Sequence, residues 1–208
     1  MSASADAASP GPTPHPPPPA NLAARALPIK TLADPLVRMY SLGKAPKFFG
    51  RLVRYRFDAP RREFGTMYAG NDEFCAFIET YGDQLEPYRL LTQTELDKKG
   101  LAEVRPRRPL QLVDLTGEGL AQVGADARIA AGDDYALSRQ WSLAFHEHPE
   151  RIDGLWYRSR HDPARLSAAL FDRVSPAIQV IARGALMDTA RRALVGRLTN
   201  TYRFGIIP

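Results

Sequence analysis

The sequence predicts a single domain of the α/β class, on the borderline with α+β, built as a mixed sheet flanked by helices. Short runs rich in aromatic and apolar residues, most of them closed by a turn residue, alternate along the chain with longer runs of helical periodicity. The chain has 208 residues, which suffices for one domain with a well-buried core and a tail. We therefore expect one domain preceded by a tail.

The predicted tail lies at the N-terminus. Residues 9–20, "SPGPTPHPPPPA", are mostly proline and offer almost nothing apolar to bury, so this segment should stay extended and mobile. We assign residues 1–27 to a proline-rich disordered tail and residues 28–208 to the folded domain. The N-terminus also lacks a basic region followed by an apolar region, so it does not resemble a secretory signal.

The first part of the domain is predicted to contain two strands and a helix. The strands are "LVRMYS" (36–41) and "GTMYAG" (65–70). The helix "NDEFCAFIETYG" (71–82) begins with Asn71 or Asp72 as its N-cap. Its apolar residues recur at i, i+3, i+4 and i+7, which gives one buried stripe.

The middle of the chain is predicted to form a strand, a helix and a second strand. "LQLVDLTG" (110–117) is a strand that ends in Thr-Gly. "DDYALSRQWSLAFHEHP" (133–149) is a helix capped by Asp133 or Asp134 that stops before its last proline. "DGLWYRSR" (153–160) is a strand that leaves a turn.

The C-terminal part completes the alternation. Residues 166–172 and 177–184 are predicted strands, residues 187–201 form an amphipathic helix, and residues 202–207 form a last strand. Short strands interleaved with helices then assemble into the mixed sheet.

Composition limits the classes of function. Hydrophobic residues make up 44% of the chain and charged residues 25%, which is typical of a globular protein, and no apolar run approaches the length of a membrane span. A single cysteine, Cys75, excludes an internal disulfide and lies on the apolar side of its helix, where a buried, inert thiol is expected. We expect a cytoplasmic protein. The net charge of +5 favours an anionic partner, either nucleic acid, a phosphorylated small molecule or an acidic protein.

Several catalytic signatures are absent from the sequence. It contains no GxGxxG after a strand, no GxxxxGK[ST], no GxSxG and no HExxH, so dinucleotide-fold dehydrogenases, P-loop enzymes, esterases and zincins are disfavoured. His146 and His148 lie near a helix end, where we expect them to face solvent or the helix dipole, and we expect no metal site.

A dispersed set of polar residues remains within apolar segments. Arg38 lies between two apolar neighbours, Arg56 precedes a turn at Pro60, and Tyr68 ends a strand. Each has a purely structural alternative: the arginines can pair with acidic residues at the surface, and Tyr68 can belong to the core. Asp58 can accept hydrogen bonds from backbone amides of the turn.

Two further residues of this set depend on local periodicity. Glu79 lies about 100° beyond the apolar stripe of its helix, so it is either solvated, paired with a surface arginine, or directed into a cleft. Alternation along the strand 153–160 places Ser159 on one face with Tyr157 and His161. There Ser159 can serve a site or simply bond to the backbone.

These pieces, taken in order, resemble a known family. "LVRMYS", "RYRFDAP", "FGTMYAGNDEFCAFIET", "LQLVDLTGEGLAQVGAD", "DDYALSRQWSLAFHEHPE" and "IDGLWYRSRHDPARLSAALFDR" are similar to the RES domain, the toxin half of RES–Xre toxin–antitoxin pairs. The resemblance covers nearly all of residues 35–205. It implies a fold like that of ADP-ribosyltransferase toxins, with a cleft between two small sheets.

The resemblance also implies an activity, the cleavage of NAD⁺ at the nicotinamide–ribose bond. NAD⁺ would be a substrate, with water or inorganic phosphate as acceptor, and no cofactor is expected. By position, the catalytic residues of the family correspond to Arg56, Tyr68, Glu79 and Ser159. The family often has Gly-Arg-[FW]-Asn where this chain reads Tyr-Arg-Phe-Asp, which keeps the arginine in place.

Other residues and partners follow from the same resemblance. Substrate-binding residues correspond to Arg38, Tyr40 and Arg160. An Xre-type antitoxin is the expected protein partner, with a homodimer within the complex as one arrangement, and nucleic acid would be contacted only through the antitoxin. Two alternatives remain: an ADP-ribosyltransferase that modifies a macromolecule, and a non-catalytic basic module that binds nucleic acid or an acidic partner.

Overall fold

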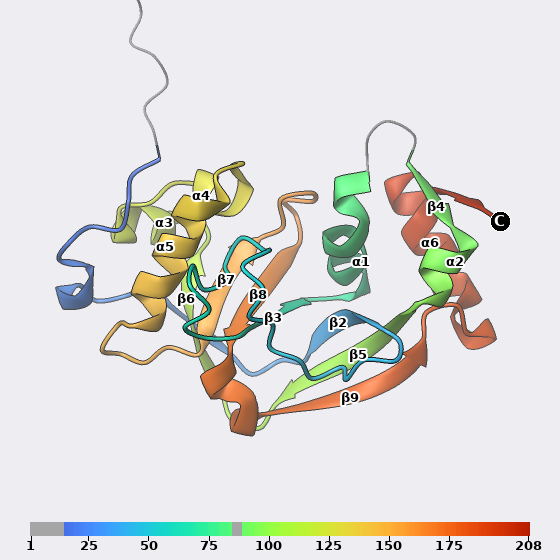
Figure 1. The fold of residues 1–208 in the computed structure, drawn as a ribbon, viewed down its shortest axis with the longest axis horizontal. Coiled ribbons are helices and arrows are strands. Elements are labelled where there is room, and N and C mark those ends of the chain that lie inside the picture. Colours follow the sequence, from blue (N-terminus) through green and yellow to red (C-terminus); the bar gives the residue numbers. More distant parts are fainter. Residues whose placement is uncertain (1–14, 85–88) are drawn as a thin grey trace, which may run out of the picture.

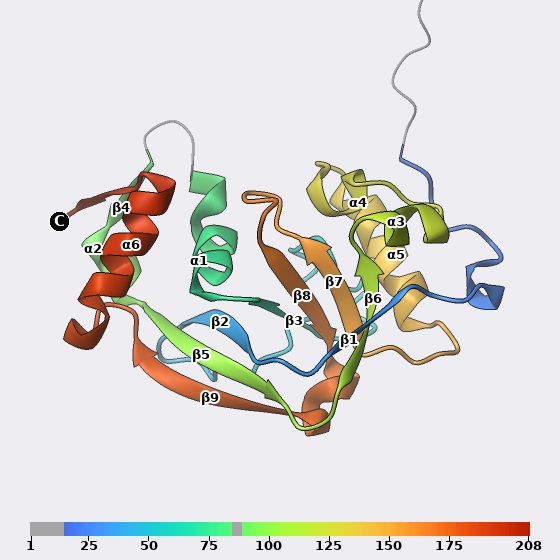
Figure 2. The same ribbon diagram turned by 180° about the vertical axis from the view of Figure 1, so that it is seen from behind.

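The computed structural model describes residues 15–84 and 89–208 (Figures 1 and 2). Its centre is an eight-stranded sheet, with a second sheet of two strands beside it. In spatial order, the strands of the large sheet are β1 (Ile29–Leu32), β6 (Leu110–Leu115), β7 (Gly154–Arg158), β8 (Leu166–Phe171), β3 (Thr66–Gly70), β2 (Leu36–Ser41), β5 (Lys99–Pro106) and β9 (Ile178–Ala185). The small sheet pairs β10 (Gly205–Ile207) with β4 (Leu90–Thr92) in parallel.

Helices surround this sheet. They are α1 (Glu73–Tyr81), α2 (Gln93–Asp97), α3 (Glu118–Val123), α4 (Arg128–Ala131), α5 (Tyr135–His146) and α6 (Arg192–Tyr202), with short 3₁₀ turns at Leu22–Ala24, Gly82–Gln84, Asp172–Ala177 and Thr189–Arg191. Figure 1 shows α3, α4 and α5 grouped at one end of the molecule and α2 and α6 at the other, with α1 between the two groups.

The large sheet is mixed and almost divided. β6 and β7 run parallel, whereas all other pairs of neighbouring strands in this sheet run antiparallel. β2 and β3 share a single residue pair, Val37 with Gly70. The predicted mixed sheet is therefore confirmed, but the two small sheets expected around a cleft are a five-stranded and a three-stranded part of one sheet, joined at that pair.

Helix α1 begins directly after β3. Asp72 is its N-cap, and the Asp72 carboxylate accepts a hydrogen bond from the Cys75 backbone N–H at 2.7 Å. The turn between strand and helix is tight, because a Cβ at Gly70 would lie 2.6 Å from the Cys75 Cβ. Of the predicted apolar stripe, Phe77, Ile78 and Tyr81 are buried and Phe74 is half-buried. Cys75 and Ala76 are buried as well, so the buried face of the helix is broader than the stripe.

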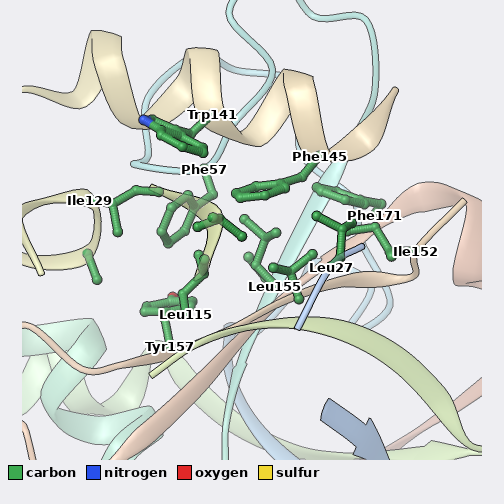
Figure 3. Packing of buried hydrophobic residues seen from close by; sticks show 14 of the residues in the cluster. Leu27, Phe57, Leu115, Ile129, Trp141, Phe145, Ile152, Leu155, Tyr157 and Phe171 are labelled. Carbon is green, nitrogen blue, oxygen red and sulfur yellow. The ribbon is translucent and has the colours of Figure 1, made fainter. Parts of the chain in front are cut away.

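Helix α5 covers the first of three apolar clusters. Asp134 caps this helix by accepting from the Leu137 N–H at 3.1 Å. Figure 3 shows Trp141 and Phe145 reaching from α5 onto Phe57 and the side chains of the sheet, with Tyr157 at the far edge of the cluster. Phe57, the residue after Arg56, is thereby anchored in this cluster.

The N-terminal segment that precedes residue 28 contributes to the same cluster. Leu22 and Leu27 are buried there, and the Trp141 indole N–H donates to the Pro16 carbonyl at 2.9 Å. Residues 15–27, which the proline content assigned to the tail, therefore pack on the domain. The remainder of the predicted tail, residues 1–14, lies outside the described residues.

Most predicted elements are observed, with local differences. β2 has the predicted bounds, whereas β10 begins only at Gly205 because Tyr202 still belongs to α6. β7 ends at Arg158, so Ser159 lies beyond the strand on which we had placed it. The sequence did not predict six elements: β1, β4, β5, α2, α3 and α4. In the part of the chain that the structure describes, no helix is long and apolar enough to cross a membrane.

Candidate active site

The closest contact between predicted site residues joins Ser159 and Glu79. Ser159 donates from its hydroxyl to the Glu79 carboxylate, with 2.5 Å between Oγ and Oε1. The two residues are 80 positions apart, and α1 and the segment after β7 bring them together. Ser159 is buried, with 1% of its surface exposed, whereas Glu79 is exposed. The carboxylate is therefore fixed from the protein side and open on the other.

The direction of that hydrogen bond follows from the other contacts of Ser159. Its Oγ accepts from the backbone N–H groups of His161 at 3.3 Å and Asp162 at 3.2 Å. With its acceptor positions used, the hydroxyl hydrogen points to Glu79. Ser159 therefore bonds to the backbone, one of the two interpretations offered by the sequence, and also donates to Glu79.

Arg56 lies in the loop between β2 and β3 and is almost fully buried. Its Nη1 donates to the Gly132 carbonyl at 2.5 Å, and its guanidinium lies 4.4 Å from the centroid of the Tyr135 ring. Its Nη2 is buried and has no hydrogen-bond partner among the described residues. Burial lowers the pKa of Arg56, as does the charge of Arg160, while Glu79 raises it. Arg56 and Glu79 are thus close enough to interact electrostatically.

Tyr68 and Asp58 hold the turn that carries Arg56. Asp58 accepts through Oδ2 from the backbone N–H groups of Arg54 at 2.9 Å and Tyr55 at 2.8 Å, as predicted for its carboxylate. Through Oδ1 it accepts from the Tyr68 hydroxyl at 2.9 Å, and that hydroxyl accepts from the Phe57 N–H at 3.0 Å. Burial and Asp58 raise the pKa of Tyr68 well above its usual range, so Tyr68 stays neutral and acts here as a positioning residue.

Arg38 reaches across the division of the sheet. From β2, its Nη1 donates to the Tyr68 carbonyl on β3 at 2.7 Å. Its Nε is buried and has no hydrogen-bond partner in the described parts of the chain. The contacts place Arg38 beside Tyr68 and close to Tyr55. Burial lowers the pKa of Arg38, and the nearby Tyr55 phenol opposes this with a smaller upward effect. Arg38 and Arg56 therefore each keep one donor unpaired.

Two buried groups lie next to the carboxylate of Glu79. Burial and the Glu79 charge raise the pKa of Tyr157 well above its usual range. Cys75 lies one helical turn before Glu79, with its Sγ 3.1 Å from the Ser167 Oγ, and burial raises its pKa to about 12. The prediction that this thiol is buried is confirmed, and its raised pKa is in keeping with an inert group. The sequence did not single out Tyr157 as a site residue, because its alternating pattern is that of any core strand.

The other predicted binding residues, Arg160 and Tyr40, have fewer contacts with the site residues described above. Arg160 pairs with Asp133 at 2.9 Å and lies near enough to Arg56 to affect its pKa. Tyr40 lies on β2, where its ring packs over Gly100, and no hydrogen bond or ring contact joins it to the group. Arg160 thus belongs to the edge of the site, and Tyr40 to its surroundings.

One of the two histidines near the end of α5 differs from expectation. His146 stacks on Phe64 with 4.1 Å between ring centroids, and burial lowers its pKa to about 4. His148 is buried and its Nε2 lies 3.2 Å from the Leu22 and Arg25 carbonyls. His146 lies in the last turn of α5, as the prediction of a histidine near the helix dipole requires, and is half-buried. For His148 the prediction was wrong, because its side chain is buried against the N-terminal segment. The described residues contain no group of His, Cys, Asp and Glu able to hold a metal ion.

Comparison with known proteins identifies the family of this fold. The RES domain model matches residues 35–192. The chain belongs to the RES domain family. This RES domain is 35% identical over 94 residues to the probable toxin y4kH of Sinorhizobium fredii (strain NBRC 101917 / NGR234), an alignment that covers 45% of this chain and 73% of that protein.

A solved structure is similar to this RES domain in fold. The match is to the crystal structure of the M. tuberculosis MbcT-MbcA toxin-antitoxin complex, with a TM-score of 0.60 and 16% identity, over 86% of this chain and 95% of that chain. At this identity the likeness establishes the fold alone. It confirms the predicted class, a mixed sheet with flanking helices of the ADP-ribosyltransferase-like type.

The arrangement suits chemistry in which positive charge develops on the substrate. An exposed carboxylate held by a buried hydroxyl can stabilise a cation without having to reorganise. Two guanidinium groups, one buried and one half-buried, are of the type that binds phosphate oxygens. A leaving group that departs neutral needs no strong general acid, so a reaction of that kind suits this arrangement.

Proposed function

We propose that this RES domain is a toxin that degrades NAD⁺ by cleaving the N-glycosidic bond between nicotinamide and ribose. The observation that carries the proposal is the 2.5 Å hydrogen bond from the buried Ser159 to the exposed Glu79, formed within electrostatic reach of Arg56. Membership of the family and the relative described as a probable toxin support the same function.

The chemistry follows from the charges of substrate and site. When the bond between the ribose C1′ and the pyridinium nitrogen breaks, its electron pair neutralises the pyridinium and nicotinamide departs uncharged. The ribose then carries the positive charge as an oxocarbenium ion. Glu79 stabilises that ion more than the ground state, in which the positive charge lies on the pyridinium ring. Ser159 holds the carboxylate in place, and Tyr157, whose pKa is raised by burial and by the Glu79 charge, stays protonated.

The acceptor completes the reaction. Water attacks C1′, loses a proton and gives ADP-ribose; inorganic phosphate would instead give ADP-ribose 1″-phosphate. Arg56 and Arg38 bind the pyrophosphate, since guanidinium groups match pairs of phosphate oxygens. Arg160 adds positive charge at the edge of the same site.

The proposed partner is an Xre-type antitoxin that inhibits the toxin in a complex. A toxin that consumes NAD⁺ needs such an inhibitor in the cell that makes it. The similar fold in the MbcT-MbcA complex comes from a protein crystallised with its antitoxin, which supports this part of the proposal. Co-expression with an Xre-type protein should restore growth to cells that express the active chain.

The substitution Glu79→Gln tests the catalytic part. It keeps the volume and removes the charge, so nicotinamide release from NAD⁺ should fall by at least about 100-fold, comparable to the loss of one stabilising group in a preorganised site. Purified protein free of antitoxin would be incubated with NAD⁺, with and without phosphate, and products identified by chromatography. Glu73→Gln, on the same helix but outside the site, is the matched control.

The outcome separates the proposal from its alternatives. Loss of activity in Glu79→Gln alone, with unfolding midpoints unchanged, supports the catalytic role. Label transferred from NAD⁺ to protein or nucleic acid would identify an ADP-ribosyltransferase. Wild-type protein that releases no nicotinamide but binds nucleic acid in a salt-dependent manner would be a basic binding module.

A further inference from the structure

The Tyr55 ring lies outside the core and has no role in the proposed bond cleavage. Tyr55 lies directly before Arg56 in the loop between β2 and β3, and 49% of its surface is exposed. Large aromatic side chains dominate burial and binding energetics in proteins. One that stays half exposed next to a candidate site is therefore a candidate for ligand contact.

The backbone of Tyr55 is held on both sides of the residue. Its N–H donates to the Asp58 Oδ2 at 2.8 Å, and its carbonyl accepts from the Arg139 Nε at 3.0 Å. Val53, two residues earlier, has a φ of 52°, a left-handed conformation that a β-branched residue adopts only under strain. The loop thus takes a strained path that ends with the Tyr55 backbone fixed and its ring exposed.

The ring of Tyr55 lies beside two residues of the site. Its centroid is 5.6 Å from that of the Tyr68 ring, with 64° between the ring planes. Its phenol is close enough to Arg38 to influence that guanidinium, and the Arg54 guanidinium lies 5.5 Å from its ring centroid. Aromatic and cationic groups together provide the surroundings that planar bases attached to phosphates favour.

We propose that Tyr55 is a specificity-determining residue whose ring stacks on one of the two planar nitrogen heterocycles of NAD⁺, an inference that rests on the proposed cleavage of this substrate. Stacking needs a flat ring that is held in place and accessible. Tyr55 has a fixed backbone, a ring in edge contact with that of Tyr68, and about half of its surface exposed. Nicotinamide and adenine share the chemistry that such a ring recognises. The test must therefore distinguish between the two.

The test compares Tyr55→Ala with Tyr55→Phe and wild type in steady-state cleavage of NAD⁺. Loss of one aromatic stack should raise KM on the order of tenfold. Phenylalanine keeps the stacking face, so its KM should stay near the wild-type value. Leu52→Ala, which alters another exposed apolar side chain of the same loop, is the matched control and should leave KM unchanged.

Competitive inhibitors identify the stacked base. If Tyr55 contacts adenine, Tyr55→Ala weakens inhibition by AMP and leaves kcat unchanged, since a remote base is bound equally in the ground and transition states. If it contacts nicotinamide, inhibition by nicotinamide mononucleotide weakens instead. Either result supports the proposal.

Three outcomes overturn the proposal. A wild-type KM in Tyr55→Ala excludes a contact between Tyr55 and the substrate. An equal rise of KM in Tyr55→Ala and Tyr55→Phe assigns the effect to the hydroxyl, and an equal rise in Leu52→Ala assigns it to the loop. In each of these, wild-type protein still cleaves NAD⁺. Failure of the proposed function is different, because then wild type releases no nicotinamide at all.

Discussion

The pair formed by Ser159 and Glu79 gives the most direct test of how this site is built. Replacing Ser159 with alanine removes the only donor that the structure aims at the Glu79 Oε1 from the described part of the protein. The carboxylate remains charged and exposed, but it loses its fixed orientation. Under the proposed chemistry, Ser159→Ala should therefore reduce kcat/KM without abolishing activity.

The size of the loss can be worked out from the contact. A hydrogen bond to a charged group contributes about 1.5–3 kcal/mol. The lower end applies, because Glu79 is exposed and water can replace the hydroxyl. Since about 1.4 kcal/mol corresponds to tenfold in rate, kcat/KM should fall about tenfold.

A second loss is structural. The alanine leaves the N–H groups of His161 and Asp162 without their acceptor at a position that is 1% exposed. This should cost about 1–3 kcal/mol of stability. For a chain of this size, each kcal/mol lowers the melting temperature by about 2–4 °C, so assays should be run well below the transition.

A double-mutant cycle separates the two effects. NAD⁺ cleavage would be measured for wild type, Ser159→Ala, Glu79→Gln and the double variant. If Ser159 acts through the carboxylate, Ser159→Ala should cost about tenfold in wild type and less than about threefold when Glu79 is already Gln. An equal loss in both backgrounds would refute the reasoning and leave Ser159 with a purely structural role.

Two further predictions concern stability. Asp58→Asn should lower the free energy of unfolding by about 1–3 kcal/mol, because one amide oxygen cannot replace two carboxylate oxygens that accept from the Arg54 and Tyr55 N–H groups and the Tyr68 hydroxyl; an unchanged urea midpoint would contradict this. Burial lowers the pKa of His146 from 6.5 to about 4, so between these pH values the unfolded state binds more protons than the folded state. The free energy of unfolding should therefore fall as pH drops from about 6.5 to about 4, and His146→Gln should flatten this dependence in urea titrations. Equal slopes in variant and wild type would show that other groups cause it.

The parts of the fold that sequence predicted are those with a strong local signal. The helix over 73–81 has a capping aspartate and a regular apolar stripe, and the strand over 36–41 has a dense apolar run. β5 was missed because "KGLAEVRP" mixes charged and apolar residues, and its strand state depends on pairing with β2 and β9 on either side. Local periodicity does not register such tertiary pairing.

The N-terminal segment shows the same limit from the opposite direction. Its proline content correctly excludes helices and strands for residues 15–21. It does not exclude docking, because an extended backbone can still donate carbonyls and insert single apolar side chains. Leu22 and the Pro16 carbonyl are used in this way by the core and by Trp141.

For the site, sequence predicted the residue types but not their contacts. Glu79 remained ambiguous by periodicity, since an exposed carboxylate at the edge of a stripe has no local signature of function. The structure leaves it exposed and adds the partner 80 residues away that gives it an orientation. Tyr68 is a second example. The residue is half-buried, and its hydroxyl forms hydrogen bonds with Phe57 and Asp58 in the turn that carries Arg56.

The near division of the sheet explains why a site lies here. A carbonyl at an unpaired strand edge needs a donor from elsewhere. β2 and β3 diverge on the N-terminal side of Gly70 in β3. There the Tyr68 carbonyl takes its donor from the Arg38 guanidinium rather than from the neighbouring strand. Arg56 is held in the same way, by the Gly132 carbonyl.

Each arginine thus uses one N–H to fix its orientation on the backbone and keeps another donor, the Arg38 Nε or the Arg56 Nη2, without a protein partner among the described residues. An unpaired buried donor costs about 1–3 kcal/mol, and native proteins rarely keep such groups without a reason. Under the proposed function, an anionic substrate that reached these groups would provide one, because guanidinium groups that are already oriented lose little freedom on binding phosphate oxygens. The stability lost by leaving these donors unpaired would then be recovered on substrate binding.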